Sequence, residues 1–289
     1  MSVRREGGAT RTSQDARRLG PEDAAVFETL VAPRYLSMFV EPALAMLAGG
    51  EDARVCHLQC RTGYPDRALL ERLPGAHVFG CDASEHAIDL ARVKAAALAR
   101  KNPGTAFDYR VVPGNLLPFP DGAFSHALTF HPLVAHDARR DLLSELARLV
   151  APAGQVLVAL PLRGSFVEVA DLLREYALKH ERSAVSDALD AAAQLRPTEE
   201  SLARELEAAG FSFVEVAART RTLLFKNGRG FFEDPVVRLL VRAEIELDLG
   251  ASAGPEPFVY VREAIDKYWS DGDFELTVQV GVVTGRRRV

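Results

Sequence analysis

Short apolar runs alternate with amphipathic stretches through the middle of the chain. Five runs have the length and composition of buried strands: RVCHLQ (54–59), HVFGCD (77–82), FDYRVV (107–112), FSHALTF (124–130) and QVLVALP (155–161). The stretches between them predict helices over 66–73, 85–99 and 139–150, the second capped by Ser84. Because strands alternate with helices, we predict an α/β fold with a doubly wound, mostly parallel sheet and helices on both faces. Ligand chemistry is then expected at the carboxyl ends of the strands.

The regions on either side extend this pattern. Residues 1–20 are polar and rich in Arg, Gly, Ser and Thr, which predicts a flexible tail. Residues 21–47 carry apolar side chains at helical spacing and predict one or two helices, broken near Pro33 and Pro42. The C-terminal part predicts helices over 166–178, 180–195 and 198–210, strands over 211–216, 222–225 and 274–283, and a helical stretch over 229–273.

No internal repeat and no low-complexity linker follows the tail. We therefore expect one domain over residues 21–289, with its core at 50–165 and C-terminal helices and closing strands at 166–289.

Charge and cysteine content narrow the function classes. The chain has 35 Lys and Arg against 40 Asp and Glu, a formal charge of −5, so it has no excess of positive charge for a nucleic-acid partner. Its three cysteines are too few for a disulfide scaffold and indicate free thiols in a reducing compartment. The first 20 residues contain no apolar signal segment, and no run reaches the ~20 residues of a membrane span. We expect a cytoplasmic protein without a membrane span.

Four stretches carry a resemblance to a known family: VCHLQCRTG (55–63), FGCDAS (79–84), GNLLPFPDGAFSHAL (114–128) and LARLVAPAGQVLVALP (146–161). Their order resembles that of class I S-adenosylmethionine-dependent methyltransferases of the methyltransferase type 11-like group. RPTEESLARELEAAGF (196–211) and DGDFELTVQVGVV (271–283) are similar to the last helix and final strands of that family. The resemblance implies a Rossmann-like sheet of seven strands, the last one antiparallel, and S-adenosylmethionine as the cofactor.

The first motif departs from the family pattern. The family has an acidic residue and glycines at the spacing D-x-G-x-G-x-G, where this chain has His57, Gln59, Arg61 and Gly63. Glycine suits a loop that turns sharply against a ligand, because any side chain would occupy the ligand's space. We therefore interpret Gln59 and Arg61 as pocket plugs. The alternative is that they bind a different ligand, with Arg61 pairing a carboxylate or phosphate.

Three other positions are retained or nearly so. The resemblance implies that Gly63, Asp82 and Asn115 would bind the cofactor if it binds, Asp82 through the ribose hydroxyls and Asn115 through the adenine amino group. Asp82 could instead cap the following helix or pair with Arg61. Ser125 replaces the usual Asp of the family's DGSFD run, whereas turn and core positions such as Pro118 and Gly154 keep the family pattern.

The candidate catalytic and metal-binding residues are few. His131 follows the fourth predicted strand and is a candidate general base, with a satisfied loop histidine as the alternative. His57, Cys60, Cys81 and Asp82 are residue types that ligate zinc, but their spacing is not that of a zinc pair, and we expect no metal. TFHPLV (129–134) lacks the Asn and the aromatic residue that amino-methylating relatives use, which disfavours that chemistry.

The sequence leaves two hypotheses for function. The first is a catalytically inactive pseudo-methyltransferase, with no cofactor, that serves as a protein-interaction or regulatory module. Its protein partner, unidentified by the sequence, would bind the Arg-rich tail or residues 180–195 and 229–273. The alternative is an active S-adenosylmethionine-dependent methyltransferase of a small molecule, which requires Gln59 and Arg61 to turn out of the pocket.

Overall fold

The computed structural model describes residues 18–250 and 254–289. Its sheet has seven strands in the order β3-β2-β1-β4-β5-β7-β6. The strands are β1 (Arg54–Leu58), β2 (His77–Asp82), β3 (Ala106–Val111), β4 (Phe124–Phe130), β5 (Val150–Pro161), β6 (Phe211–Phe225) and β7 (Phe274–Arg287). The pairs among β1 to β5 are parallel, and β7 runs antiparallel to both β5 and β6. The predicted fold class is confirmed.

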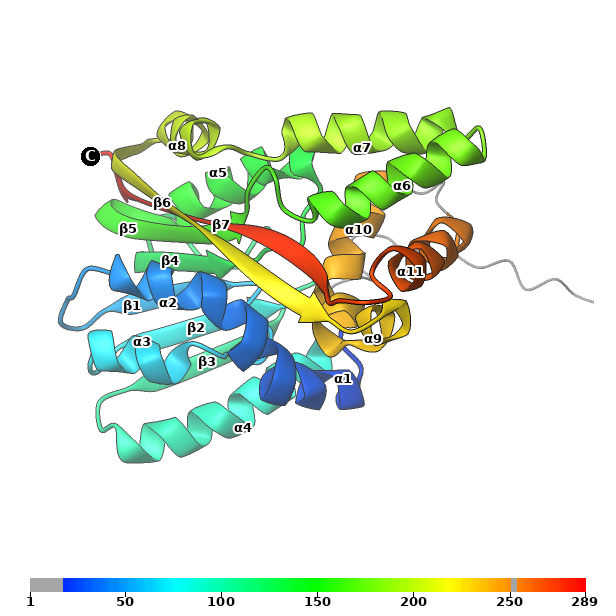
Figure 1. Cartoon of the computed structure of the whole chain (residues 1–289). Coiled ribbons are helices and arrows are strands. Elements are labelled where there is room, and N and C mark those ends of the chain that lie inside the picture. Colours follow the sequence, from blue (N-terminus) through cyan, green and yellow to red (C-terminus); the bar gives the residue numbers. More distant parts are fainter. Residues whose placement is uncertain (1–17, 251–253) are drawn as a thin grey trace, which may run out of the picture.

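Helices cover both faces of this sheet (Figure 1). The N-terminal and core helices are α1 (Pro21–Val26), the π-helical η2 (Phe27–Leu36), α2 (Ser37–Ala45), α3 (Asp66–Arg72), α4 (Glu85–Lys101), the 3-10 turn η3 (His136–Ala138) and α5 (Arg139–Leu149). The C-terminal helices are α6 (Val167–Lys179), α7 (Ser183–Leu195), α8 (Glu199–Ala208), α9 (Gly228–Glu233), the π-helical η4 (Val237–Val241), α10 (Arg242–Leu249) and α11 (Glu256–Tyr268).

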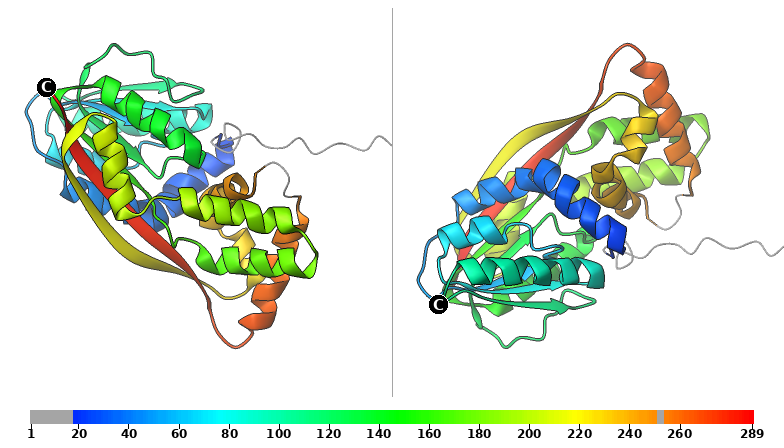
Figure 2. Two further views of the ribbon diagram at one scale, coloured as in Figure 1. Left: turned by 90° about the horizontal axis from the view of Figure 1, so that it is seen from above. Right: turned by 90° about the horizontal axis from the view of Figure 1, so that it is seen from below.

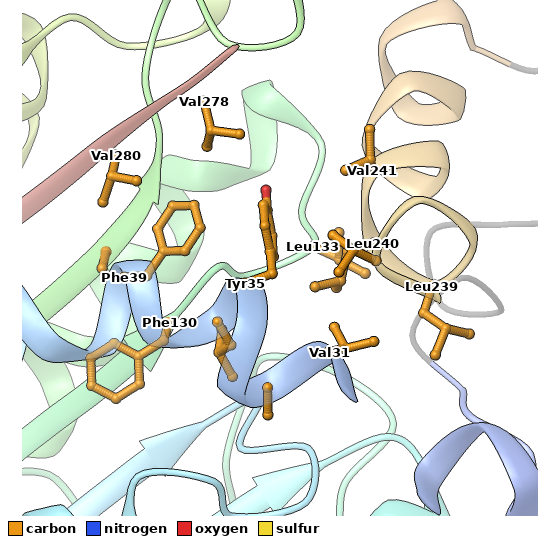
Figure 3. Packing of buried hydrophobic residues seen from close by; sticks show 14 of the residues in the cluster. Val31, Tyr35, Phe39, Phe130, Leu133, Leu239, Leu240, Val241, Val278 and Val280 are labelled. Carbon is orange, nitrogen blue, oxygen red and sulfur yellow. The ribbon is translucent and has the colours of Figure 1, made fainter. Parts of the chain in front are cut away.

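The alternation of side chains along the central strands separates two main apolar clusters. Val55 of β1 and Val78 of β2 belong to the cluster that includes α2 and α3, whereas Cys56 and Cys81 belong to the cluster that includes α5 and α8. The first cluster continues beyond the sheet into the C-terminal helices. Figure 3 shows Val31 and Tyr35 of η2 facing Leu239 to Val241 of η4, above the carboxyl ends of the strands. The C-terminal helices therefore pack over the helical run that covers this end of the sheet.

The N-terminal helical region differs from the prediction. We expected breaks near Pro33 and Pro42, but residues 21–45 form one helical run through α1, η2 and α2. Pro33 lies in the π-helical segment and Pro42 lies in α2. The buried side chains of Phe27, Tyr35 and Phe39 hold this run against the core. Tertiary packing thus outweighs the cost of the two prolines.

The long strand β6 is also a correction, because we expected separate strands over 211–216 and 222–225. Residues 217–221 are half-buried or exposed and carry no apolar pattern, but their backbone pairs with β7 throughout. A register shift between Ser212 and Glu215, with Phe213 at φ 51°, marks a β-bulge.

The N-terminal boundary of the fold also differs from the prediction. Of the predicted tail, residues 1–17 lie outside the described residues. Leu19, in contrast, is packed, with 8% of its surface exposed. Its backbone N–H donates to the hydroxyl of Ser84, which in turn donates to the Leu19 carbonyl, each at 3.0 Å. The structured part therefore begins before residue 21. Among the described residues, no helix is long and apolar enough to cross a membrane.

Gly228 marks a close approach between two distant segments. A Cβ atom at this position would collide with the backbone carbonyl of Arg262 in α11, and the Gly228 N–H donates to Asp266 at 2.7 Å. Gly228→Ala is expected to destabilise the protein by about 2 kcal/mol, because the backbone of neither segment can move without breaking its hydrogen bonds. Urea unfolding measures this loss, and Gly272→Ala, where a Cβ meets open space, is the matched control.

Candidate functional site

The loop after β1 has the backbone conformation of a glycine-rich turn. Gln59, Arg61 and Gly63 have φ angles of 54°, 49° and 66°. For residues with a Cβ atom this left-handed conformation costs roughly 1–2 kcal/mol. At Gly63 a Cβ would lie 2.6 Å from Asp66 Oδ2 and 2.8 Å from Tyr109 Oη, so only glycine fits. The loop therefore has left-handed backbone at all three positions, although only the last of them is glycine.

The Arg61 side chain enters the space at the end of β4. Its Nη1 donates to the Phe130 carbonyl at 3.0 Å and its Nη2 donates to the His131 carbonyl at 2.7 Å. The guanidinium carbon lies 5.5 Å from the centre of the Phe27 ring, a cation–π contact. Burial lowers the pKa of the guanidinium from its ordinary value, but an arginine remains charged at physiological pH. Arg61 is thus a buried cation held by two carbonyl oxygens and an aromatic face.

Gln59 bridges two further parts of the same region. Its Nε2 donates to Asn115 Oδ1 at 3.1 Å, and its Oε1 accepts from the Leu133 N–H at 2.9 Å. Only 6% of its surface is exposed, as for Arg61. The side-chain oxygen of Asn115, which would accept from adenine if a cofactor bound, therefore accepts from the chain itself.

Asp82, at the end of β2, also bonds within the chain. Its Oδ2 accepts from the Arg61 backbone N–H and its Oδ1 accepts from the Ser84 N–H, both at 2.9 Å. The Ser84 hydroxyl in turn caps α4, as predicted, by accepting from the Ala87 N–H. Asp82 thus contacts the backbone of Arg61, and its charge also raises the pKa of the Arg61 guanidinium. It orients two loops, which is close to the capping role that the sequence left open.

His131 is fully buried behind the loop. Its Nε2 lies 3.0 Å from Tyr35 Oη, and its ring packs edge-on against Phe39 with ring centres 5.0 Å apart. Figure 3 shows Tyr35 and Phe39 on the same helical run as Val31. Burial, together with the charge of Arg61, holds the pKa of His131 well below its usual value, so the ring is neutral. Its Nδ1 is buried without a hydrogen-bond partner among the described residues, so only one of the two ring nitrogens is satisfied.

The remaining candidates at these strand ends do not assemble into a metal site. Burial, with the charge of Arg61, lowers the pKa of His57 to about 3, and its ring packs against Phe130. Cys60 and Cys81 are buried neighbours, joined by a backbone hydrogen bond of 3.1 Å. Among the described residues, no group of three or more His, Cys, Asp and Glu side chains is placed to hold a metal ion.

A buried ionic cluster that sequence reasoning missed interacts electrostatically with Arg61 and Tyr35. Arg196 Nη2 lies 2.7 Å from Asp248 and 3.4 Å from Glu244, and His136 Nε2 lies 2.8 Å from Asp248. Burial raises the pKa of Glu244, while Arg196 lowers it. These residues come from α10, η3 and the segment after α7, so sequence spacing carries no signal of their contact.

A hollow of the described residues lies away from these strand ends. It has a volume of about 960 Å³, lies between α5 and α8, and is lined by residues including Arg140, Leu195, Arg204 and Ala208. The residues that line it include none of Gln59, Arg61, Gly63, Asp82 and Asn115. This hollow is therefore separate from the predicted cofactor positions.

Comparisons with known proteins agree with this architecture. Residues 55–154 match the family model described as a methyltransferase domain. Among solved structures, the YcgJ protein of Bacillus subtilis has a TM-score of 0.53 at 12% identity, covering 88% of this chain and 98% of that one. Geranyl diphosphate C-methyltransferase of Streptomyces coelicolor A3(2) has a TM-score of 0.50 at 16% identity, covering 96% and 88%. The strand order is that of the class I methyltransferase Rossmann-like fold, and residues 55–154 are similar to its methyltransferase domain.

Two curated relatives match part of the chain. Malonyl-[acyl-carrier protein] O-methyltransferase of Halorhodospira halophila is 32% identical over 182 residues, 59% of this chain and 57% of that protein. Demethylmenaquinone methyltransferase of Thermus thermophilus is 35% identical over 103 residues, 35% of this chain and 44% of that protein. The chain therefore spans about half the length of these relatives.

The residues of this chain do not fit the family's cofactor in the observed conformation. A bound S-adenosylmethionine would need the space beside the loop at Gln59 and Arg61. Both side chains occupy this space, and their polar atoms are hydrogen-bonded within the chain. Asn115 would have to give up its contact with Gln59 to accept from an adenine. Cofactor binding thus requires at least two buried side chains to leave their places.

Proposed function

We propose that this protein is a pseudo-methyltransferase whose cofactor site is closed by its own side chains and which serves as a protein-interaction or regulatory module. The observation that carries the proposal is the position of the Arg61 guanidinium, bonded to the carbonyls of Phe130 and His131. S-Adenosylmethionine carries a sulfonium cation. The Arg61 guanidinium already provides a positive charge at these strand ends, where carbonyl oxygens and the Phe27 ring contact it. Gln59 adds amide contacts to Asn115 and Leu133.

Expelling these side chains is costly. Moving Arg61 would break two charge-assisted hydrogen bonds, each worth about 1.5–3 kcal/mol, and leave two buried carbonyls without these donors. Moving Gln59 would break two more. A ligand that displaced both would have to supply this free energy before any net affinity appeared.

A second candidate function is an active methyltransferase of a small molecule, and the names of the two curated relatives favour it. In that case Gly63, Asp82 and Asn115 would hold the cofactor, and Gln59 and Arg61 would turn outward as it entered. His131 does not suit the role of a general base, because it is fully buried and its lowered pKa makes it a weak base, so such a reaction would depend on alignment of the reactants.

Titration of the wild-type protein with S-adenosylmethionine and S-adenosylhomocysteine separates the two candidates. We expect no heat in calorimetry and no shift in melting temperature at millimolar ligand, because the closed site leaves no room for either molecule. A dissociation constant in the micromolar range, roughly −8 kcal/mol, would overturn the pseudo-methyltransferase proposal. Asp82→Ala would then report whether the bound molecule uses the ribose position.

A further inference from the structure

The outermost strand of the sheet is long and uncovered on one side. β6 stands at the end of the strand order, next to β7 alone, and runs for 15 residues. Both views in Figure 2 place it along the outer side of the molecule, with β7 on its inner side. The N–H and C=O groups on the outer side of such an edge can pair with a further strand.

The side chains on this edge form an unusual pattern. From Glu215 to Phe225 the pairing with β7 is regular, so odd-numbered residues share one face of the strand. Glu215, Arg219 and Arg221 are exposed on that face, whereas Val216 and Ala218 on the other face pack against the α5 and α8 cluster. In the part of the chain that the structure describes, no ion pair includes any of these three charged residues.

We propose that β6 is a dimerisation edge, at which a second copy of this chain adds its own β6 in antiparallel orientation. A two-fold axis beside Ala218 relates each residue to the one equally far on the other side. Glu215 then stands opposite Arg221 of the partner subunit, and the pair occurs twice by symmetry. Seven consecutive residues, 215–221, take part before the bulge at Phe213 interrupts the regular strand.

The charges and the length of regular strand favour this register over its neighbours. A shift of the axis by two residues, to Thr220, would place Arg219 opposite Arg221 of the partner subunit, and like charges opposite each other are destabilising. An axis at Ala217 would place Glu215 opposite Arg219 of the partner subunit, but only residues 215–219 would pair before the bulge at Phe213. The axis at Ala218 combines opposite charges with the longer regular pairing, as an isologous interface requires.

The oligomeric state tests this proposal directly. Light scattering on the purified chain after size exclusion, at loadings up to about 100 µM, is expected to give twice the chain mass of 31.5 kDa. Glu215→Arg and Arg221→Glu should each raise the dimer dissociation constant by at least about tenfold, because each places two like-charged pairs at the interface. The double variant Glu215→Arg/Arg221→Glu should restore the dimer.

The matched control is Glu263→Arg, an exposed residue of α11 with the same change in charge, which should leave the mass unchanged. All substituted residues are exposed, so melting temperatures should stay close to that of the wild type. A wild-type chain that is monomeric at every loading would overturn the proposal. So would a dimer that the single variants do not weaken, or one that the charge exchange fails to restore.

Discussion

The double variant Gln59→Gly/Arg61→Gly is expected to bind S-adenosylhomocysteine with a dissociation constant in the micromolar range, at least about 100-fold tighter than the wild type. The substitutions remove both side chains that fill the site while keeping the conformation of the loop. Glycine adopts the φ angles of 54° and 49° without the strain that glutamine and arginine carry. The retained Asp82 and Asn115 would then face the vacated space.

Calorimetry on the folded double variant measures this gain. The single variants serve as internal controls, because each leaves one side chain in place and should bind much more weakly than the double variant. Adding Asp82→Ala to the double variant should remove the gained affinity. A double variant that melts cooperatively and still binds nothing at millimolar ligand would show that the side chains are not what closes the site.

The second large effect concerns the pH dependence of stability at Asp66. This carboxyl, at the start of α3, is 1% exposed and accepts a hydrogen bond from Tyr109. Burial raises its pKa from the ordinary 3.8 to about 7, against the lowering effects of Tyr109 and Lys94. At a pH between these two pKa values, Asp66 is ionised in the unfolded chain but protonated in the folded protein. The free energy of unfolding therefore falls as the pH rises. The loss is complete above pH 7 and amounts to about 4 kcal/mol.

Asp66→Asn removes this titration while keeping an oxygen that can accept from Tyr109. The stability of the variant relative to the wild type is therefore expected to increase by about 4 kcal/mol from pH 4 to pH 8, measured by urea unfolding. Glu71→Gln, on the exposed side of the same helix, is the control and should show almost no such change. Parallel stability curves for Asp66→Asn and the wild type would contradict the assigned pKa.

Most of the fold follows from local patterns in the sequence. The strands β1, β2 and β4 are short runs of mostly buried residues, and the caps at Ser84 and Thr198 start their helices where predicted. The errors fall where tertiary contacts decide the structure. Residues 217–221 of β6 have no apolar period and are strand only because β7 pairs with them. The helical run across Pro33 persists because its neighbours are buried.

The candidate site was predictable in part. The departures at Gln59 and Arg61 could be seen from the spacing of the first motif, and their destination follows from the lack of room beside a ligand-binding loop. Their partners could not be predicted, because the carbonyls of Phe130 and His131 carry no sequence signature. The cluster around Arg196 was missed for a similar reason, since its members are joined only by the packing of α10 against the end of α7.

The cradle that holds Arg61 also determines what a vacated site would select. Two carbonyl oxygens and the Phe27 ring converge on one buried point, and none of them carries a positive charge. Without the arginine side chain, this point would attract small organic cations with N–H donors, such as guanidinium, in preference to neutral or anionic molecules. The free energy of unfolding of an Arg61→Gly chain would then increase with the concentration of such an added cation. The cation concentration would therefore set the fraction of the chain that is folded.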